Sequence, residues 1–197
     1  MPTSRLEAFS DGVLAIIITI MVLELRPPEG ATLEDLRDVS TGFLTYLLSF
    51  VYIGIYWNNH HHLFQLVRRV DGRVLWANLD LLFWLSLYPF TTAWMDETGL
   101  ARTPVVVYGV NLLAAAIAYY VLQLTILRAE GDDGVVRAAI GRDLKGKLSP
   151  VIYLLGIGSA LWVAEWLALV CYVAVAAMWL VPDRRFEGYV VEHGTAA

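Results

Sequence analysis

The sequence predicts an all-α integral membrane protein with six transmembrane helices in each subunit. Of its 197 residues, 58% are hydrophobic and only 17% are charged, and the mean hydropathy is +0.59. The apolar residues fall in long runs that end at charged clusters or at Pro and Gly. A soluble domain keeps a more even balance of apolar and charged residues. A bilayer is therefore the simplest environment for this chain.

Six apolar runs are candidate spans, since about 20 helical residues cross a hydrocarbon core of roughly 30 Å. They lie near residues 6–25, 40–66, 74–95, 103–127, 149–164 and 166–182. The last two form one apolar run interrupted only by Glu165, and a straight helix over it would be about 50 Å long. We therefore expect a tight hairpin near Ala164 and Glu165. Residues 1–197 are expected to form a single transmembrane domain.

The positions of the basic residues predict the orientation of these spans. Six spans place both termini, the second loop and the fourth loop on one side of the membrane. That side carries eleven of the 14 Lys and Arg residues, and the other side carries only Arg26, Arg37 and Arg102. The positive-inside rule then makes both termini cytoplasmic, in a multi-pass protein of the cell membrane. The fourth loop, residues 129–147, is expected to carry a short amphipathic helix after Gly134.

Polar side chains gather at the expected cytoplasmic ends of the first three spans, where an ionisable group costs about 2.5 to 3.5 kcal/mol and needs a partner or water. In chain order they are Arg5, Ser10 and Asp11, then Asn58, Asn59, His60, His61 and His62, then Asn78 and Asp80. Their similar depth suggests a shared network in which Asp11 accepts from Arg5 or from a histidine. A structural role is favoured over ion contact, because charges within membranes usually pair with one another. Adjacent helical residues point about 100° apart, so the three histidines predict no metal site.

One face of the first span carries Ile16, Thr19, Ile20 and Leu23 at helical spacing. In a symmetric bundle this stripe would form stacked rings of isoleucine, threonine and leucine. Apolar rings can limit the width of a pore, and a threonine ring adds oxygens for a partly dehydrated cation. The same stripe also fits an ordinary packing surface. The two halves of the chain show no repeat, so a symmetric pore would need several copies.

The run Arg5-Leu6-Glu7-Ala8-Phe9-Ser10-Asp11-Gly12, followed by an Ile-rich helix with Thr19, resembles the signature of the lysosomal potassium channel family, transmembrane protein 175, and its prokaryotic single-repeat members. The stretch from Tyr56 to Phe64, and Asn78 followed by Leu87-Tyr88-Pro89-Phe90, resemble the same family. The resemblance implies a homotetramer whose first helices line a K⁺-conducting pore without a carbonyl filter. It implies a constriction at Ile16, with Thr19 and Leu23 as further layers. It also implies a structural network of Arg5, Phe9, Ser10 and Asp11 with a second-span histidine.

We therefore expect a passive, K⁺-permeable channel in the lipid bilayer, with no cofactor, no metal beyond permeating K⁺ and no nucleic-acid partner. An enzyme is not expected, because no motif places a nucleophile beside a base. A proton-coupled transporter is the alternative, with Asp11, a second-span histidine and Asp80 as its proton carriers. A membrane scaffold without transport is a third hypothesis.

Overall fold

A computed structural model describes residues 3–68, 70–130 and 144–180, and these ranges contain helices and no strands. The helices are α1 (Thr3–Leu23), α2 (Leu33–Asp38), α3 (Ser40–Gln65), α4 (Gly72–Ser86), α5 (Tyr88–Glu97), α6 (Arg102–Glu130), α8 (Leu144–Trp162) and α9 (Glu165–Leu180). Of these, α1, α3 and α6 are by themselves long and apolar enough to cross a membrane. The predicted all-α fold is confirmed.

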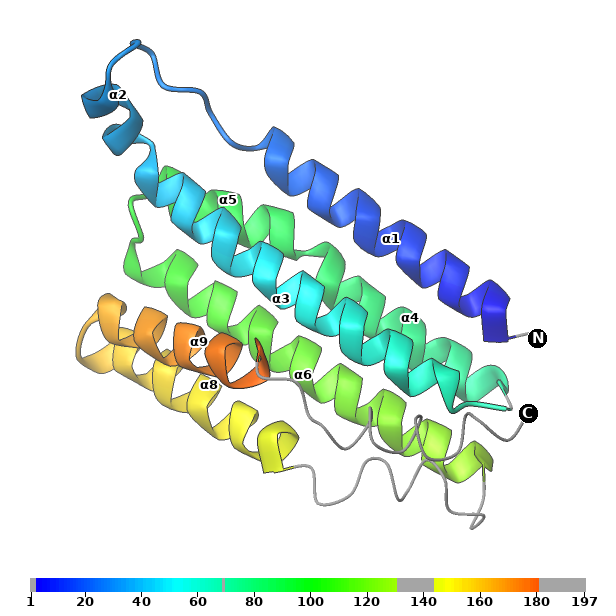
Figure 1. Ribbon diagram of the computed structural model, residues 1–197. Helices are drawn as coiled ribbons and strands as arrows, with labels where there is room; N and C mark the ends of the chain where they lie inside the picture. Colours follow the sequence, from blue (N-terminus) through cyan, green and yellow to red (C-terminus); the bar gives the residue numbers. More distant parts are fainter. Residues whose placement is uncertain (1–2, 69, 131–143, 181–197) are drawn as a thin grey trace.

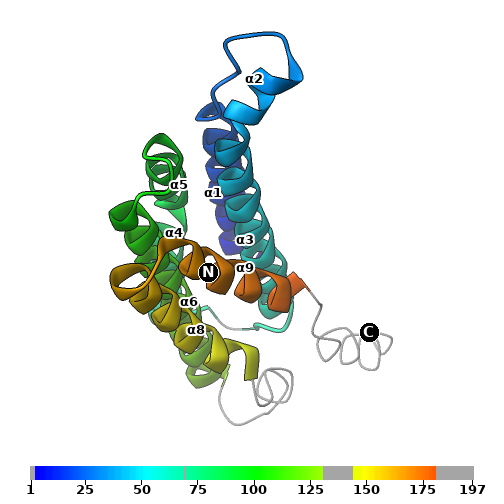
Figure 2. The same ribbon diagram turned by 90° about the vertical axis from the view of Figure 1, so that its left-hand side faces the viewer.

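The helices form a bundle with α1 at one edge and the α8–α9 hairpin at the opposite edge (Figure 1). Helix α1 packs on α3, α4 and α5, and α6 joins this half to the hairpin through contacts with α8 and α9. In the view turned by 90°, α1 lies beside α3, and α8 lies beside α6 (Figure 2). The position of α1 leaves one of its faces uncovered by its own subunit.

The third predicted span, residues 74–95, is not one continuous helix. It is divided into α4 and α5 at Leu87. Pro89 lies in the first turn of α5, where its missing N–H removes no helical hydrogen bond. Its ring would clash with a carbonyl four residues earlier in a continuous helix, so the break precedes it. Hydropathy did not predict this break, because the residues on both sides of Leu87 are apolar enough to belong to one membrane span.

The predicted hairpin is present, since α8 ends at Trp162 and α9 begins at Glu165. Helix α8 begins at Leu144, earlier than the expected start at residue 149 and inside the expected loop 129–147. The Lys145 ammonium lies 5.9 Å from the centroid of the Trp179 ring, which favours this charge in the first turn. The amphipathic helix expected after Gly134 falls outside the described residues, as does the end of the last span.

Local signals set several helix ends. The Thr32 hydroxyl accepts from Asp35 N, and the Asp35 carboxylate accepts from both Thr32 N and Thr32 Oγ1, which is a capping box at the start of α2. These hydrogen bonds lower the pKa of Asp35. Asp71 caps α4 by accepting from Arg73 N and Val74 N. Gly99, with a φ of 59°, turns the chain between α5 and α6.

Candidate functional site

A buried chain of hydrogen bonds joins α1, α4 and α3. Asn78 Nδ2 donates to Ser10 Oγ at 3.0 Å, and the Ser10 hydroxyl donates to the Leu6 carbonyl at 2.9 Å. His60 Nε2 lies 2.7 Å from Asn78 Oδ1. Because Asn78 Oδ1 can only accept, His60 Nε2 must carry the proton. Ser10 and Asn78 are fully buried and His60 nearly so, so these bonds hold three helices together away from water.

Of the three histidines, the structure thus brings His60 into contact with Asn78, which in turn binds Ser10. The His60 ring packs on Phe64, with 4.4 Å between ring centroids. His61 is exposed and accepts from Gln65 Nε2 at 2.9 Å. His62 is partly exposed and lies against the ring of His61. The three adjacent histidines therefore have three different environments.

Asp11 binds a partner that the sequence did not suggest. Its Oδ1 accepts from Trp57 Nε1 at 3.1 Å, and neither Arg5 nor a histidine is hydrogen-bonded to it among the described residues. The Trp57 ring stacks on His61, with an interplanar angle of 16°. This contact is a second link between α1 and α3. The only indication of this contact in the sequence is that Trp57 precedes His61 by one helical turn, which places the two side chains on the same face of α3.

The other predicted network residues, Arg5, Phe9 and Asp80, are exposed on the subunit surface. No hydrogen bond or ion pair joins them to the network among residues 3–68, 70–130 and 144–180. Asn58 is likewise exposed. The structure therefore divides the predicted cluster into a buried part around Asn78 and a surface part.

The uncovered face of α1 carries the predicted stripe. Ile16 is 59% exposed and Leu23 81%, and Thr19 and Ile20 are exposed beside them. The opposite face is buried against the subunit through Leu6, Ser10, Leu14, Ile17 and Met21. The Thr19 hydroxyl donates to the Ile16 carbonyl at 2.8 Å. Its proton is thereby used within the helix, and its oxygen lone pairs remain available at the surface.

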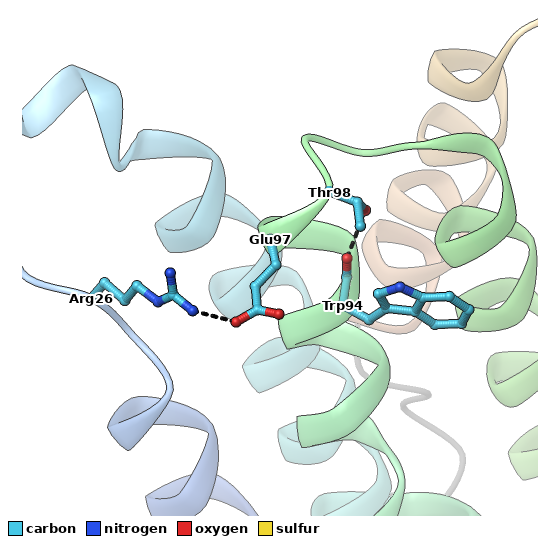
Figure 3. Close-up of polar contacts among 4 residues, drawn as sticks. All are labelled: Arg26, Trp94, Glu97 and Thr98. Carbon is cyan, nitrogen blue, oxygen red and sulfur yellow. Dashed lines mark hydrogen bonds and ion pairs between the residues drawn. The ribbon is translucent and has the colours of Figure 1, made fainter.

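At the end of α1 far from Ser10, an ion pair fixes the chain that follows the helix. The Arg26 guanidinium binds the Glu97 carboxylate at the end of α5, and the Thr98 hydroxyl donates to the Trp94 carbonyl at 2.7 Å (Figure 3). Both ion-pair partners are more than half exposed. Helix α1 is thus attached to the subunit at both ends, by buried hydrogen bonds at one and by this ion pair at the other.

In the part of the chain that the structure describes, no three His, Cys, Asp or Glu side chains are grouped closely enough to hold a metal ion. Polar contacts that the sequence did not suggest also join α3, α5 and α6. Ser49 Oγ lies 2.7 Å from Thr92 Oγ1 and 3.0 Å from the Tyr108 hydroxyl.

Known proteins with similar sequences and folds are ion channels. Residues 5–89 match the family model described as endosomal/lysosomal potassium channel TMEM175. A protein of Chryseobacterium sp. named as a potassium channel is 50% identical over 98% of this chain and 100% of its own length. A protein of Chamaesiphon minutus, also named as a potassium channel, is 34% identical over 87% of this chain and 90% of its own length.

The fold agrees with these sequence matches. The crystal structure of a lysosomal potassium-selective channel TMEM175 homolog from Chamaesiphon minutus superposes with a TM-score of 0.79 and 32% identity, covering 91% of this chain and 96% of that one. The family consists of ion channels and not of enzymes. This chain therefore belongs to the TMEM175 family of membrane channels.

Proposed function

We propose that the protein is a potassium-permeable channel of the cell membrane in which α1 lines the pore. The exposed stripe on α1 carries this proposal, because the helix is packed firmly on one side and leaves apolar residues and one hydroxyl on the other. The names of its bacterial relatives support potassium as the permeating ion. Four copies around a common axis would bring four such stripes together.

In this arrangement Ile16 forms the narrow apolar constriction, and Thr19 and Leu23 form the next two layers. An apolar ring offers a cation no replacement for its hydration shell, so a narrow ring admits most easily the ion that loses water at the lowest cost. K⁺ is larger than Na⁺ and is dehydrated more easily. Since the Thr19 hydroxyl proton binds the Ile16 carbonyl, the threonine oxygen is free to accept the cation.

The buried hydrogen bonds of Ser10, Asn78 and His60 would set the position of α1 against α3 and α4. Polar contacts between membrane helices contribute about 0.6 to 2 kcal/mol each, enough to hold a pore wall in one rotation. Arg5, Phe9, Asp11, His61, His62 and Asp80 are proposed to form the surface part of this cluster, separate from the buried hydrogen bonds, at the same end of the pore. The exposed members among them would face water, lipid or a neighbouring copy.

The proposed topology has six spans, with α4 and α5 forming one broken span and α8 and α9 forming the last two. Both termini are cytoplasmic in this topology, as the distribution of Lys and Arg predicts. One subunit is then a single six-helix domain. The surrounding lipid contacts the apolar residues on the outside of the tetramer.

The alternative of a proton-coupled transporter is less well supported. A proton relay from His60 to Asp11 would have to pass through groups that exchange protons. The partner of His60 is the Asn78 amide, and the partner of Asp11 is the Trp57 indole. Neither group titrates near neutral pH. These contacts favour a structural network over a relay.

Purified protein in liposomes tests the proposal, with K⁺ and Na⁺ fluxes measured separately and single-channel recording as a second readout. We expect Ile16→Asn to raise flux or to weaken the preference for K⁺ several-fold, because an amide ring can replace water around Na⁺. Val22→Asn is the matched control, since Val22 is exposed on α1 but lies outside the stripe. Equal effects of the two substitutions, or no effect of Ile16→Asn on either flux, would contradict the pore assignment.

A further inference from the structure

A small cavity with several polar side chains in its wall lies inside the subunit, where α3 and α6 meet the α8–α9 hairpin. Its volume is about 40 Å³. Among its lining residues are Tyr56, Asn59, Tyr119, Gln123, Ser149 and Trp179. All twelve lining residues are uncharged. No residue of α1 lines it, so the cavity is separate from the proposed pore.

Two polar side chains that line this cavity form no side-chain hydrogen bond within the part of the chain that the structure describes. Gln123 is 6% exposed and Tyr56 8%. None of the hydrogen bonds formed among the described residues involves the Gln123 amide or the Tyr56 hydroxyl. A buried amide or hydroxyl without a hydrogen bond is strongly disfavoured. Because both side chains line the same cavity, one small ligand can serve both.

Several other polar groups of the wall are already bonded to protein. The Ser149 hydroxyl donates to the Lys145 carbonyl at 2.8 Å and accepts from Trp179 Nε1 at 2.9 Å. The Tyr119 hydroxyl donates to the Asn59 carbonyl at 3.2 Å. Gln123, which offers donors and an acceptor, and Tyr56 therefore retain unused hydrogen-bonding capacity on the cavity wall.

We propose that this cavity is a hydration site, in which a small cluster of water molecules bridges Gln123 and Tyr56. A water needs about 10 to 15 Å³ of such space and two to four polar partners, so about three molecules fit. An uncharged wall gives no counter-charge for an ion. The bound water links α6 to α3 beside the hairpin, and it stabilises the docking of α8 and α9 on the rest of the subunit.

Thermal unfolding of the full-length protein in detergent micelles tests this site, because the direction in which a substitution shifts the unfolding midpoint depends on whether the cavity holds water. Gln123→Met keeps the side-chain volume and removes the polar atoms. If water serves the amide, we expect the midpoint to fall by at least about 2 °C, because the bridge is lost. In a dry cavity the same substitution removes an unpaired amide and raises the midpoint, which would overturn the proposal.

Asn111→Leu is the matched control. The Asn111 amide nitrogen and oxygen are both buried without a hydrogen-bond partner among the described residues, and Asn111 does not line this cavity. We expect this substitution to raise the midpoint. Potassium flux through Gln123→Met channels should equal that of the unaltered protein, since the cavity is separate from α1.

X-ray radiolytic labelling of the unaltered protein provides a second readout that requires no variant. Tyrosines in contact with bound water are labelled faster than dry ones. Tyr56 and Tyr88 are both buried, but Tyr88 does not line the cavity, and its hydroxyl has no hydrogen-bond partner within residues 3–68, 70–130 and 144–180. We expect Tyr56 to be labelled several-fold faster than Tyr88. Equal labelling rates would contradict a hydrated cavity.

Discussion

Replacing Asn78 by leucine is the most direct test of the buried hydrogen bonds that hold α1. Asn78 is fully buried and binds both Ser10 and His60, at 3.0 and 2.7 Å. Leucine is close to asparagine in shape but has no polar atoms. The substitution therefore removes both interhelical bonds without opening a large cavity.

The expected loss of stability follows from these contacts. Each lost hydrogen bond is worth about 0.5 to 1.5 kcal/mol. The buried N–H of His60 also loses its acceptor, which costs a further 1 to 3 kcal/mol or so. We therefore expect Asn78→Leu to destabilise the subunit by about 2 to 6 kcal/mol. The double substitution of Asn78→Leu with His60→Leu should destabilise the subunit by less than the sum of the two single substitutions, because the unpaired N–H of His60 is then gone.

Reversible unfolding in mixed micelles, followed by tryptophan fluorescence, measures the loss of stability in the single and the double substitutions. Asn58→Leu is the matched control, since Asn58 is exposed on α3 and makes no hydrogen bond among the described residues. We expect it to change stability by less than about 0.5 kcal/mol. If Asn78→Leu were no more destabilising than Asn58→Leu, or if the double substitution were simply additive, the buried network would not hold α1 as inferred.

Two further predictions concern packing and charge. Gly109→Ala should destabilise the subunit by about 1 to 3 kcal/mol, because its Cβ would overlap the Tyr172 hydroxyl. Gly54→Ala, which meets nothing within 4 Å, should be neutral or stabilising in the same unfolding assay; similar losses for both would refute the close approach of α6 and α9. Arg26→Gln should cost under about 1 kcal/mol, since the ion pair with Glu97 is exposed. That loss should disappear in about 1 M salt, where surface charges are screened; a loss independent of salt would contradict an electrostatic origin.

Sequence alone determined the all-α membrane fold, because long apolar runs can satisfy their backbone in a bilayer only as helices or closed barrels. It also predicted that Ile16, Thr19 and Leu23 share one face, since helical periodicity is a local property. The hairpin before Glu165 followed from length, as one helix over that run would be too long. The break at Leu87 was missed because hydropathy does not measure whether Pro89 permits a continuous helix.

Only the tertiary structure decided which polar residues meet. The three adjacent histidines point in directions about 100° apart, and the rotation of α3 against α4 makes His60 the one that reaches Asn78. The partner of Asp11 was decided in the same way, because Trp57 meets it only when α1 lies on α3. Periodicity gives the faces of each helix, but which faces meet depends on the packing of all the helices together.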